Sequence, residues 1–158
     1  MPKPSDPMLE EFRIFAETDI RSDADLDDVA DKICALFTED CVLEDLSSTE
    51  VVRGRAELHP YCKELFGPYS NVRIEPTEII DTGTTSIMRL IISGDHTGDL
   101  YGFAPTGIRV SFPAIAIYKC NDEMTMVAHE TLAYDTGVII DQVKAARGDA
   151  PEPADADH

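Results

Sequence analysis

Several features are missing from this sequence, and each absence narrows the class of protein. No run of about 18 apolar residues occurs, which excludes a membrane-spanning helix. Residues 1–7 lack the apolar core of a signal peptide, so we expect a cytoplasmic location. The four cysteines include no Cys-x-x-Cys pair and no histidine at a zinc-finger interval. We therefore expect reduced, mostly buried thiols and no metal site.

Positive charge is also scarce, because 13 Lys and Arg residues face 31 Asp and Glu residues, giving a net charge of −18. A surface of this sign repels phosphate backbones, so we expect no nucleic-acid partner. The acidic run 23–28 lacks the glycine and the final glutamate of an EF-hand loop. We interpret it as a solvated helix start, and the sequence leaves open whether the acidity reflects a high-salt habitat.

The common catalytic loops are missing too. The chain has no Gly-x-Ser-x-Gly elbow, no Walker loop, no Gly-x-Gly-x-x-Gly fingerprint and no His-Glu-x-x-His motif. We expect no cofactor. A length of 158 residues with 43% hydrophobic content fits one soluble globular domain with a sizeable core.

The first half of the chain reads as helices. Residues 8–18 are amphipathic, with Leu9, Phe12, Phe15 and Ala16 expected inward, and residues 25–38 repeat apolar residues at helical spacing. A third helix includes residues 58–66, where a proline at position 60 is tolerable only in or near the first turn. Short strands are expected at 41–44 and 51–52.

The second half reads as strands joined by short turns, at residues 71–81, 84–93, 97–103, 108–120 and 123–134. Such short links require antiparallel neighbours. A last helix is expected at 136–146. We divide the chain into a disordered start (1–7), one domain (8–146) and a disordered acidic tail (147–158). The order predicts an α+β fold in which a cone-shaped, curved antiparallel sheet wraps around the N-terminal helices and encloses a pocket.

Four segments carry a resemblance to a known family. The first is a helix-to-strand entry, LFTEDCV (36–42), and the second is a glycine turn before the third helix, VRGRAE (52–57). The third is a hairpin with a histidine-glycine-acid and then a proline-threonine-glycine motif, HTGD with FAPTGIRV (96–110). The fourth is the C-terminal ending, Glu130 with Asp135 and Gln142. Over residues 8–146 the chain resembles the SnoaL-like polyketide cyclases of the nuclear-transport-factor-2-like superfamily.

The resemblance implies a catalytic role for Asp135. In the resembling cyclases the aspartate at this place faces the cavity and takes a proton from the carbon beside a carbonyl, and ring closure follows as an intramolecular aldol reaction. To act near neutral pH, such a carboxylate needs desolvation by apolar walls, which we expect from Phe103, Phe112 and Met88. The alternative is that Asp135 only caps the helix that starts at Thr136.

Two further acid/base candidates are His96 and Glu130. His96 could protonate the developing alkoxide, or it could sit at a bend with its imidazole bonded to the backbone. In a regular strand His129 and Asp135 share one face, whereas Glu130 and Tyr134 share the other. Only one of these sets can line the pocket unless a bulge intervenes.

The expected substrate-binding residues complete the site. Arg89 interrupts an apolar strand and must reach water or a carboxylate, because a buried unpaired guanidinium is very costly. Asp45, Tyr61 and Tyr101 are secondary candidates, each with a structural alternative.

We therefore predict a cofactor-independent cyclase or isomerase that acts on a polyketide or similar carbonyl-rich molecule by acid/base catalysis. The alternatives are an epoxide hydrolase of the same fold, to which Asp135 and Arg89 could contribute, and a non-catalytic small-ligand-binding protein. The strand at 108–120 is apolar on both faces. A homodimer through the sheet, which the family also favours, would cover the second face.

Overall fold

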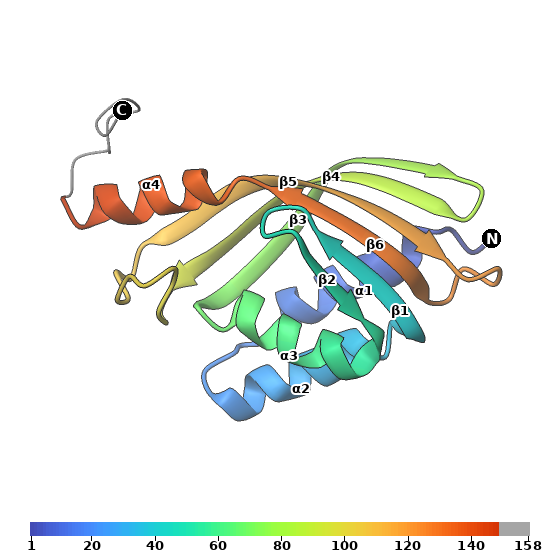
Figure 1. Cartoon of the computed structure of the whole chain (residues 1–158), viewed down its shortest axis with the longest axis horizontal. Helices are drawn as coiled ribbons and strands as arrows, with labels where there is room; N and C mark the ends of the chain where they lie inside the picture. The colour runs from blue at the N-terminus through green and yellow to red at the C-terminus, as the bar shows by residue number, and fades with distance from the viewer. Residues whose placement is uncertain (149–158) are drawn as a thin grey trace.

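The computed structural model describes residues 1–148 and shows an α+β fold in which one curved sheet arches over three helices (Figure 1). The strands lie in the order β2-β1-β6-β5-β4-β3. The elements are α1 (Asp6–Glu17), α2 (Asp23–Cys34), β1 (Phe37–Asp45), β2 (Glu50–Arg53), α3 (Gly54–Phe66), β3 (Tyr69–Thr82), β4 (Thr85–His96), β5 (Arg109–Cys120), β6 (Val127–Tyr134) and α4 (Thr136–Ala146). The predicted α+β fold with a curved sheet around N-terminal helices is confirmed.

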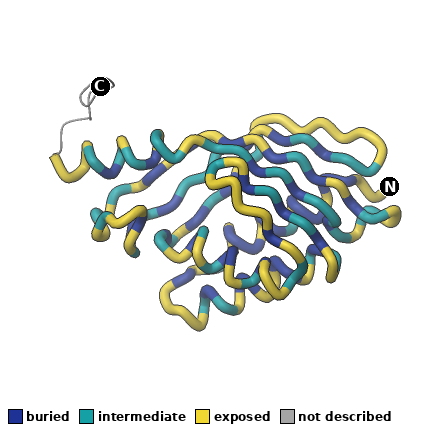
Figure 2. Tube along the Cα trace, viewed as in Figure 1, coloured by how far each residue is buried: buried dark blue, intermediate teal, exposed yellow. Residues whose placement is uncertain are grey.

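The sheet has one buried and one exposed face, and this difference creates the interior. Along β5 the buried residues alternate with exposed ones. Figure 2 colours the whole chain by burial. Because side chains of a strand point alternately to its two faces, the even-numbered residues of β5 face α1, α2 and α3, and the odd-numbered ones face outward. β3 to β6 pair antiparallel, as predicted for β3 with β4 and for β5 with β6. β4 pairs directly with β5, because the strand expected between them does not form, and β1 joins β6 in parallel.

The helical patterns are confirmed for α2 and wrong for α1. The buried residues of α2 are the predicted apolar ones. In α1, however, Leu9 is 39% exposed, and the buried face carries Met8, Glu11, Phe12 and Phe15. The pattern misled us because Phe12 and Phe15 belong to both possible faces, and leucine is a more probable core residue than glutamate. The true face brings a carboxyl group into the interior.

Two predicted elements differ from the structure. Residues 97–103 form no strand, only an isolated bridge between Leu100 and Phe103. Positive φ angles at Tyr101 (49°) and Gly102 (84°) reverse the chain between the two bridged residues, so an extended strand cannot continue. Helix α3 begins at Gly54, which places Pro60 in its second turn and not near its start.

The chain ends also differ from expectation. Residues 4–7 were predicted as disordered, but Ser5 is 2% exposed and its hydroxyl donates to Asp81, while the carbonyl of Pro4 accepts from the Cys120 thiol. The predicted helix 136–146 matches α4. Most of the predicted tail, residues 149–158, lies outside the described residues.

Within residues 1–148, no helix is both long and apolar enough to cross a bilayer.

Candidate active site

A cavity of about 270 Å³ lies between the concave face of the sheet and α3. Apolar side chains from four strands and two helices form most of its wall, among them Phe66, Val72, Ile92, Phe112, Leu132 and Ile139. The loop after β4 contributes Asp99, Leu100 and Tyr101. Largely apolar walls with a few polar groups are typical of small-molecule sites.

Asp45 is the buried carboxylate of this cavity, with 3% of its surface exposed. It ends β1 on the inward side, opposite Leu132 of β6. One carboxylate oxygen accepts from the Tyr61 hydroxyl at 2.7 Å. The other accepts from the Ser47 backbone N–H at 2.9 Å and from the Ser47 hydroxyl. These donors fix the carboxylate in one orientation inside an apolar wall.

Four tyrosines, Tyr61, Tyr69, Tyr101 and Tyr134, line the same cavity. Burial raises the pKa of all four, and for Tyr61 the hydrogen bond to Asp45 raises the pKa further. Their hydroxyls therefore stay protonated at neutral pH. The Tyr61 hydroxyl already donates to Asp45, so the other tyrosine hydroxyls are the ones that can donate to an oxygen atom of a ligand.

The charged side chains of the cavity lining are all acidic. Among the described residues, Asp45, Glu50, Glu64 and Asp99 line the cavity, and no lysine, arginine or histidine does. Because like charges repel in a partly enclosed space, this lining disfavours an anionic ligand. It favours a neutral or positively charged one.

A second, smaller cavity of about 40 Å³ lies deeper. It shares Tyr61, Leu132 and three further wall residues with the larger one, namely Leu65, Phe66 and Ile92. Glu11 of α1 and Glu130 of β6 both line it. Burial raises the pKa of Glu11 to about 8. Burial first, and then the nearby Glu11 and Asp45, raise the pKa of Glu130 well above its ordinary value.

The structure decides which face of β6 lines the interior. Glu130 pairs with Leu43 and Tyr118 on the concave side, and Tyr134 shares this face. His129 points to the other face, where its ring nitrogen lies 3.9 Å from Glu44. Asp135 is exposed, is absent from the lining of both cavities and accepts from the Gly137 N–H at 2.8 Å. The expectation that Asp135 faces the cavity is thus corrected, because strand alternation turns it outward, and its catalytic role stays a prediction.

The capping geometry predicts how Asp135 variants behave. Asp135→Ala removes the acceptor for Gly137 and should lower the free energy of unfolding by about 0.5 to 2 kcal/mol, while Asp135→Asn, which also caps well, should keep it. Urea denaturation measures both. A loss of turnover in Asp135→Asn without loss of stability would instead support the catalytic role.

His96 is completely buried but lines neither cavity. Its Nδ1 accepts from the Thr106 N–H at 3.3 Å and lies 2.8 Å from the Thr106 hydroxyl. Its Nε2 has no hydrogen-bond partner in the described chain. The bond from the Thr106 backbone matches the alternative in which the imidazole is held at a bend. The predicted protonating role of His96 stays a prediction.

The predicted substrate-binding residues divide into two groups. Phe112, Tyr101 and Asp45 line the main cavity. The other three were expected to do so and do not. The Arg89 side chain is 70% exposed and lies 3.9 Å from Glu78, Met88 is a fully buried core residue, and the Phe103 ring lies 5.1 Å beneath the Arg147 guanidinium. Arg89 reaches water because odd-numbered residues of this part of β4 face outward.

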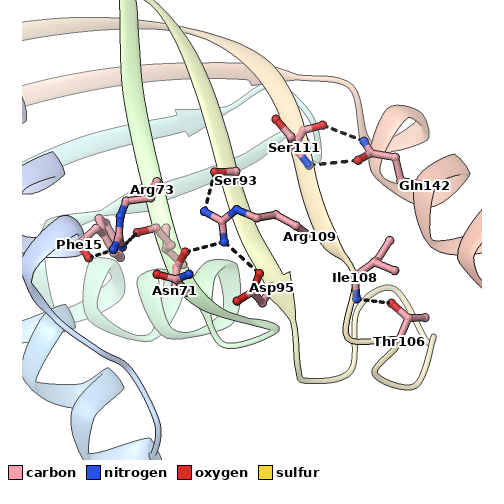
Figure 3. Close-up of polar contacts among 11 residues, drawn as sticks. Phe15, Asn71, Arg73, Ser93, Asp95, Thr106, Ile108, Arg109, Ser111 and Gln142 are labelled. Carbon is pink, nitrogen blue, oxygen red and sulfur yellow. Dashed lines mark hydrogen bonds and ion pairs between the residues drawn. The ribbon is translucent and has the colours of Figure 1, made fainter.

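Gln142, part of the resembling C-terminal ending, has a structural position. Its side-chain amide bonds both to the N–H and to the C=O of Ser111, at 3.1 and 2.8 Å, and so fastens α4 to β5 (Figure 3). Beside it, Arg109 of β5 bridges to the carbonyl of Asn71 on β3 and to Asp95 and Ser93 on β4. These contacts hold together the sheet edge that carries the cavity.

Sequence reasoning missed two features of the site. Tyr134 was noted only because an even spacing puts it on the same strand face as Glu130. That spacing is the signal that could have identified it as a cavity residue. Glu11 was missed because the opposite face of its helix was expected to be buried.

Within residues 1–148, no group of three or more histidine, cysteine or carboxylate side chains is arranged to hold a metal ion.

Comparison with known proteins agrees with this architecture. The chain is similar in structure to a candidate SnoaL-like polyketide cyclase from Shewanella putrefaciens (TM-score 0.74, 13% identity, 92% of this chain and 98% of that one). It is also similar to AclR, a candidate hydroxylase from Streptomyces galilaeus (0.70, 16%, 90% and 96%), and to IdmH, a candidate polyketide cyclase from Streptomyces antibioticus (0.69, 16%, 89% and 97%). These identities show a shared fold.

No curated protein matches the sequence. The family comparison is decisive, because residues 16–142, most of the chain, match the family of SnoaL-like polyketide cyclases. The chain belongs to the SnoaL-like polyketide cyclase family.

Proposed function

We propose that the protein is a cofactor-independent cyclase or isomerase that moves a proton on a compact, neutral, carbonyl-containing molecule. The observation that carries this proposal is the Asp45 carboxylate, held by Tyr61 and Ser47 in an otherwise largely apolar cavity. Family membership supports the reaction class. The acidic lining supports a substrate without negative charge.

In the proposed reaction Asp45 is the general base. It takes a proton from the carbon beside a carbonyl, and the electron pair moves onto the carbonyl oxygen to give an enolate. In a cyclisation the enolate carbon attacks a second carbonyl of the same molecule, a C–C bond forms, and the new alkoxide takes the proton back from Asp45. In an isomerisation the proton returns to another carbon. Tyr101 and Tyr134 line the same cavity, and we expect their hydroxyls to donate hydrogen bonds to the substrate.

Asp45 thus takes the role that the sequence assigned to Asp135. A base must reach the proton that it removes, and Asp45 lies in the wall of the cavity whereas Asp135 does not. For His96 we propose a positioning role. Its bond to the backbone of Thr106 holds the loop that carries Tyr101.

The test is mass spectrometry of β-keto esters, diketones and epoxides incubated in heavy water with the protein. We expect deuterium uptake or an isomeric product from a carbonyl compound, lost in Asp45→Asn and kept in the surface control Asp135→Asn. Tight binding without any exchange or product would favour the non-catalytic alternative. A gain of one water by an epoxide would favour the hydrolase.

The epoxide hydrolase alternative lacks its expected arginine. Such a site needs an arginine together with aspartates, and Arg89 was expected to supply it. Arg89 lies on the outer face of the sheet, and no arginine lines the main cavity among residues 1–148.

The outer face of the sheet supports the proposed homodimer. Ile80, Ile87 and Ile117 lie side by side across β3, β4 and β5, and Ile115 is 49% exposed beside them. Exposed apolar groups that gather on one face are typical of an interface. A second copy of the chain, presenting the same face about a two-fold axis, would cover them.

We expect wild-type protein to have about twice the chain mass of 17.4 kDa by light scattering at tens of micromolar. Ile115→Lys should give a monomer, because a charge in an apolar interface is costly. Leu9→Lys is the matched control, since Leu9 is a comparably exposed apolar residue on α1. A monomeric wild type would remove the dimer.

A further inference from the structure

Two carboxyl groups face the same inner cavity without any partner. Glu11 enters from α1 and Glu130 from β6, and they are 9% and 7% exposed. Within residues 1–148 neither makes a hydrogen bond or an ion pair with another side chain or with the backbone. The other lining residues are apolar except for Tyr61, Tyr118 and Cys62. Neither carboxyl is among the side-chain atoms that are sealed from solvent without a partner, so both open onto the cavity. Two mostly buried acids that open onto one cavity are a candidate functional site.

The protonation state of the pair follows from its surroundings. Two carboxylates in a low-dielectric interior would each lose hydration and would repel each other. Burial raises the pKa of Glu11 to about 8, and burial together with Glu11 and Asp45 raises that of Glu130 well above its ordinary value. Burial and the neighbouring carboxyl groups therefore favour the protonated form of Glu130. A protonated carboxyl is a hydrogen-bond donor, which a carboxylate is not.

We propose that Glu11 and Glu130 form a proton-holding pair in which Glu130 donates a hydrogen bond to the carbonyl oxygen of the bound substrate. This inference rests on the proposed proton-transfer function. It adds the group that stabilises the negative charge as this charge develops on the substrate oxygen. Donors placed where charge develops lower the barrier, and removal of one such donor costs about 100- to 1,000-fold in rate.

The geometry supports this division of roles. On β6, Glu130 lies two residues before Leu132, the partner of Asp45 on β1. Two residues of strand and one strand spacing separate Asp45 from Glu130, about 8 Å between Cα atoms. Both side chains point to the concave face, and Tyr61 lines both cavities. A substrate can thus present a C–H to Asp45 and an oxygen to Glu130.

The size of the inner cavity limits the group that reaches Glu130. A volume of about 40 Å³ accommodates an oxygen-bearing group such as a carbonyl or hydroxyl, or a few waters at most, and it excludes a ring. The main body of the substrate must remain in the cavity of about 270 Å³. We infer a compact substrate with an oxygen at its leading end.

The proton transfers in this arrangement balance. When Asp45 removes the carbon-bound proton, the enolate oxygen accepts the hydrogen bond of Glu130 and can take its proton. The Glu130 carboxylate left behind then lies at the same cavity as Glu11, which is protonated and therefore does not repel it. When the enolate carbon forms its new bond, the proton returns from the substrate oxygen to Glu130. No oxidant, reductant or metal is required.

Phenols, thiols and one further carboxyl group surround the pair. Burial raises the pKa of the surrounding phenols and thiols, so they stay neutral. Asp45 is the carboxyl group outside the pair that acts on Glu130. The groups that interact with the pair are Tyr118 on β5, Tyr61 and Cys62 on α3, Cys34 on α2, and Cys41 and Asp45 on β1.

Binding of substituted phenols, whose oxygen imitates an enolate oxygen, tests the proposal without any turnover. We expect Glu130→Leu to bind them at least 10-fold more weakly than wild type, whereas Glu130→Gln, whose amide also donates, stays within a few-fold. Wild-type affinity should fall as the pair loses its proton at high pH, and Glu130→Gln should reduce this fall. Equal affinity of wild type and Glu130→Leu, or no binding by wild type at millimolar phenol, overturns the proposal.

The phenol assay separates this proposal from the proposed function. Phenol binding that depends on Glu130, together with full turnover in Asp45→Asn, would remove the base and keep the donor. Turnover that depends on Asp45 but not on Glu130 would remove only the donor. Circular dichroism and urea denaturation of both Glu130 variants establish that they are folded.

Discussion

Replacing Asp45 by asparagine should lower turnover by roughly 100- to 10,000-fold and leave the protein folded, since general acid/base catalysis is worth about this much. The amide has nearly the shape of the carboxylate. Its oxygen can accept from the Ser47 N–H, and its NH₂ group can donate to the Tyr61 hydroxyl, which also accepts. The substitution therefore removes the base and preserves the local contacts. Steady-state kinetics gives kcat, and urea denaturation gives the free energy of unfolding.

Two variants control this experiment. Tyr61→Phe removes the hydroxyl that orients Asp45 at 2.7 Å, so it should lower kcat less than Asp45→Asn does. Asp135→Asn changes a carboxyl that lies outside both cavities, so it should retain turnover. Full activity in Asp45→Asn with loss in Asp135→Asn would return the catalytic role to Asp135.

The second large effect is a loss of stability as the pH rises. In the folded protein the pKa of Glu11 is raised from 4.5 to about 8, so between these values the folded state holds a proton that the unfolded chain has released. Stability then falls with increasing pH, because the unfolded state binds fewer protons. The contribution is fully present below about pH 4.5 and is lost as the pH passes 8. It amounts to roughly 3 to 5 kcal/mol.

Glu11→Gln should therefore be more stable than wild type at pH 9 by a few kcal/mol and about equal to it at pH 5. Urea denaturation at pH 5, 7 and 9 measures the difference. Glu10→Gln is the matched control. Glu10 is the neighbouring residue, but its side chain is 41% exposed and its hydrogen bond with Arg13 lowers its pKa, so its replacement should not remove the slope. A wild-type stability independent of pH from 5 to 9 would contradict a buried, protonated Glu11.

Both effects depend on residues whose environment the sequence could only partly predict. The curved sheet and the antiparallel pairs β3–β4 and β5–β6 followed from short turns and alternating patterns, and the family resemblance was confirmed. The parallel pairing of β1 with β6 was not predicted. Glu130 and Tyr134 were predicted to share one face of their strand, and both line the interior. Asp45, Phe112 and Tyr101 were also expected in the binding site, and they line the cavity.

The choice between two possible faces could not be predicted, for either β6 or α1. Alternation along a strand determines which residues share a face, but it does not determine which face meets the helices. In α1, Phe12 and Phe15 are compatible with an inward Leu9 or an inward Glu11. Only the contact of α1 with the concave sheet resolves this, and it places Glu11 at the inner cavity with Glu130.

Local patterns and short connections were enough to predict the α+β fold, the antiparallel pairs β3–β4 and β5–β6, and the family. The tertiary structure decided the site. Asp45 ends β1, Tyr61 lies on α3, and Glu11 lies on α1, and no spacing rule relates positions on separate elements. They meet because the curved sheet folds over the helices and turns one face of each element toward a common interior.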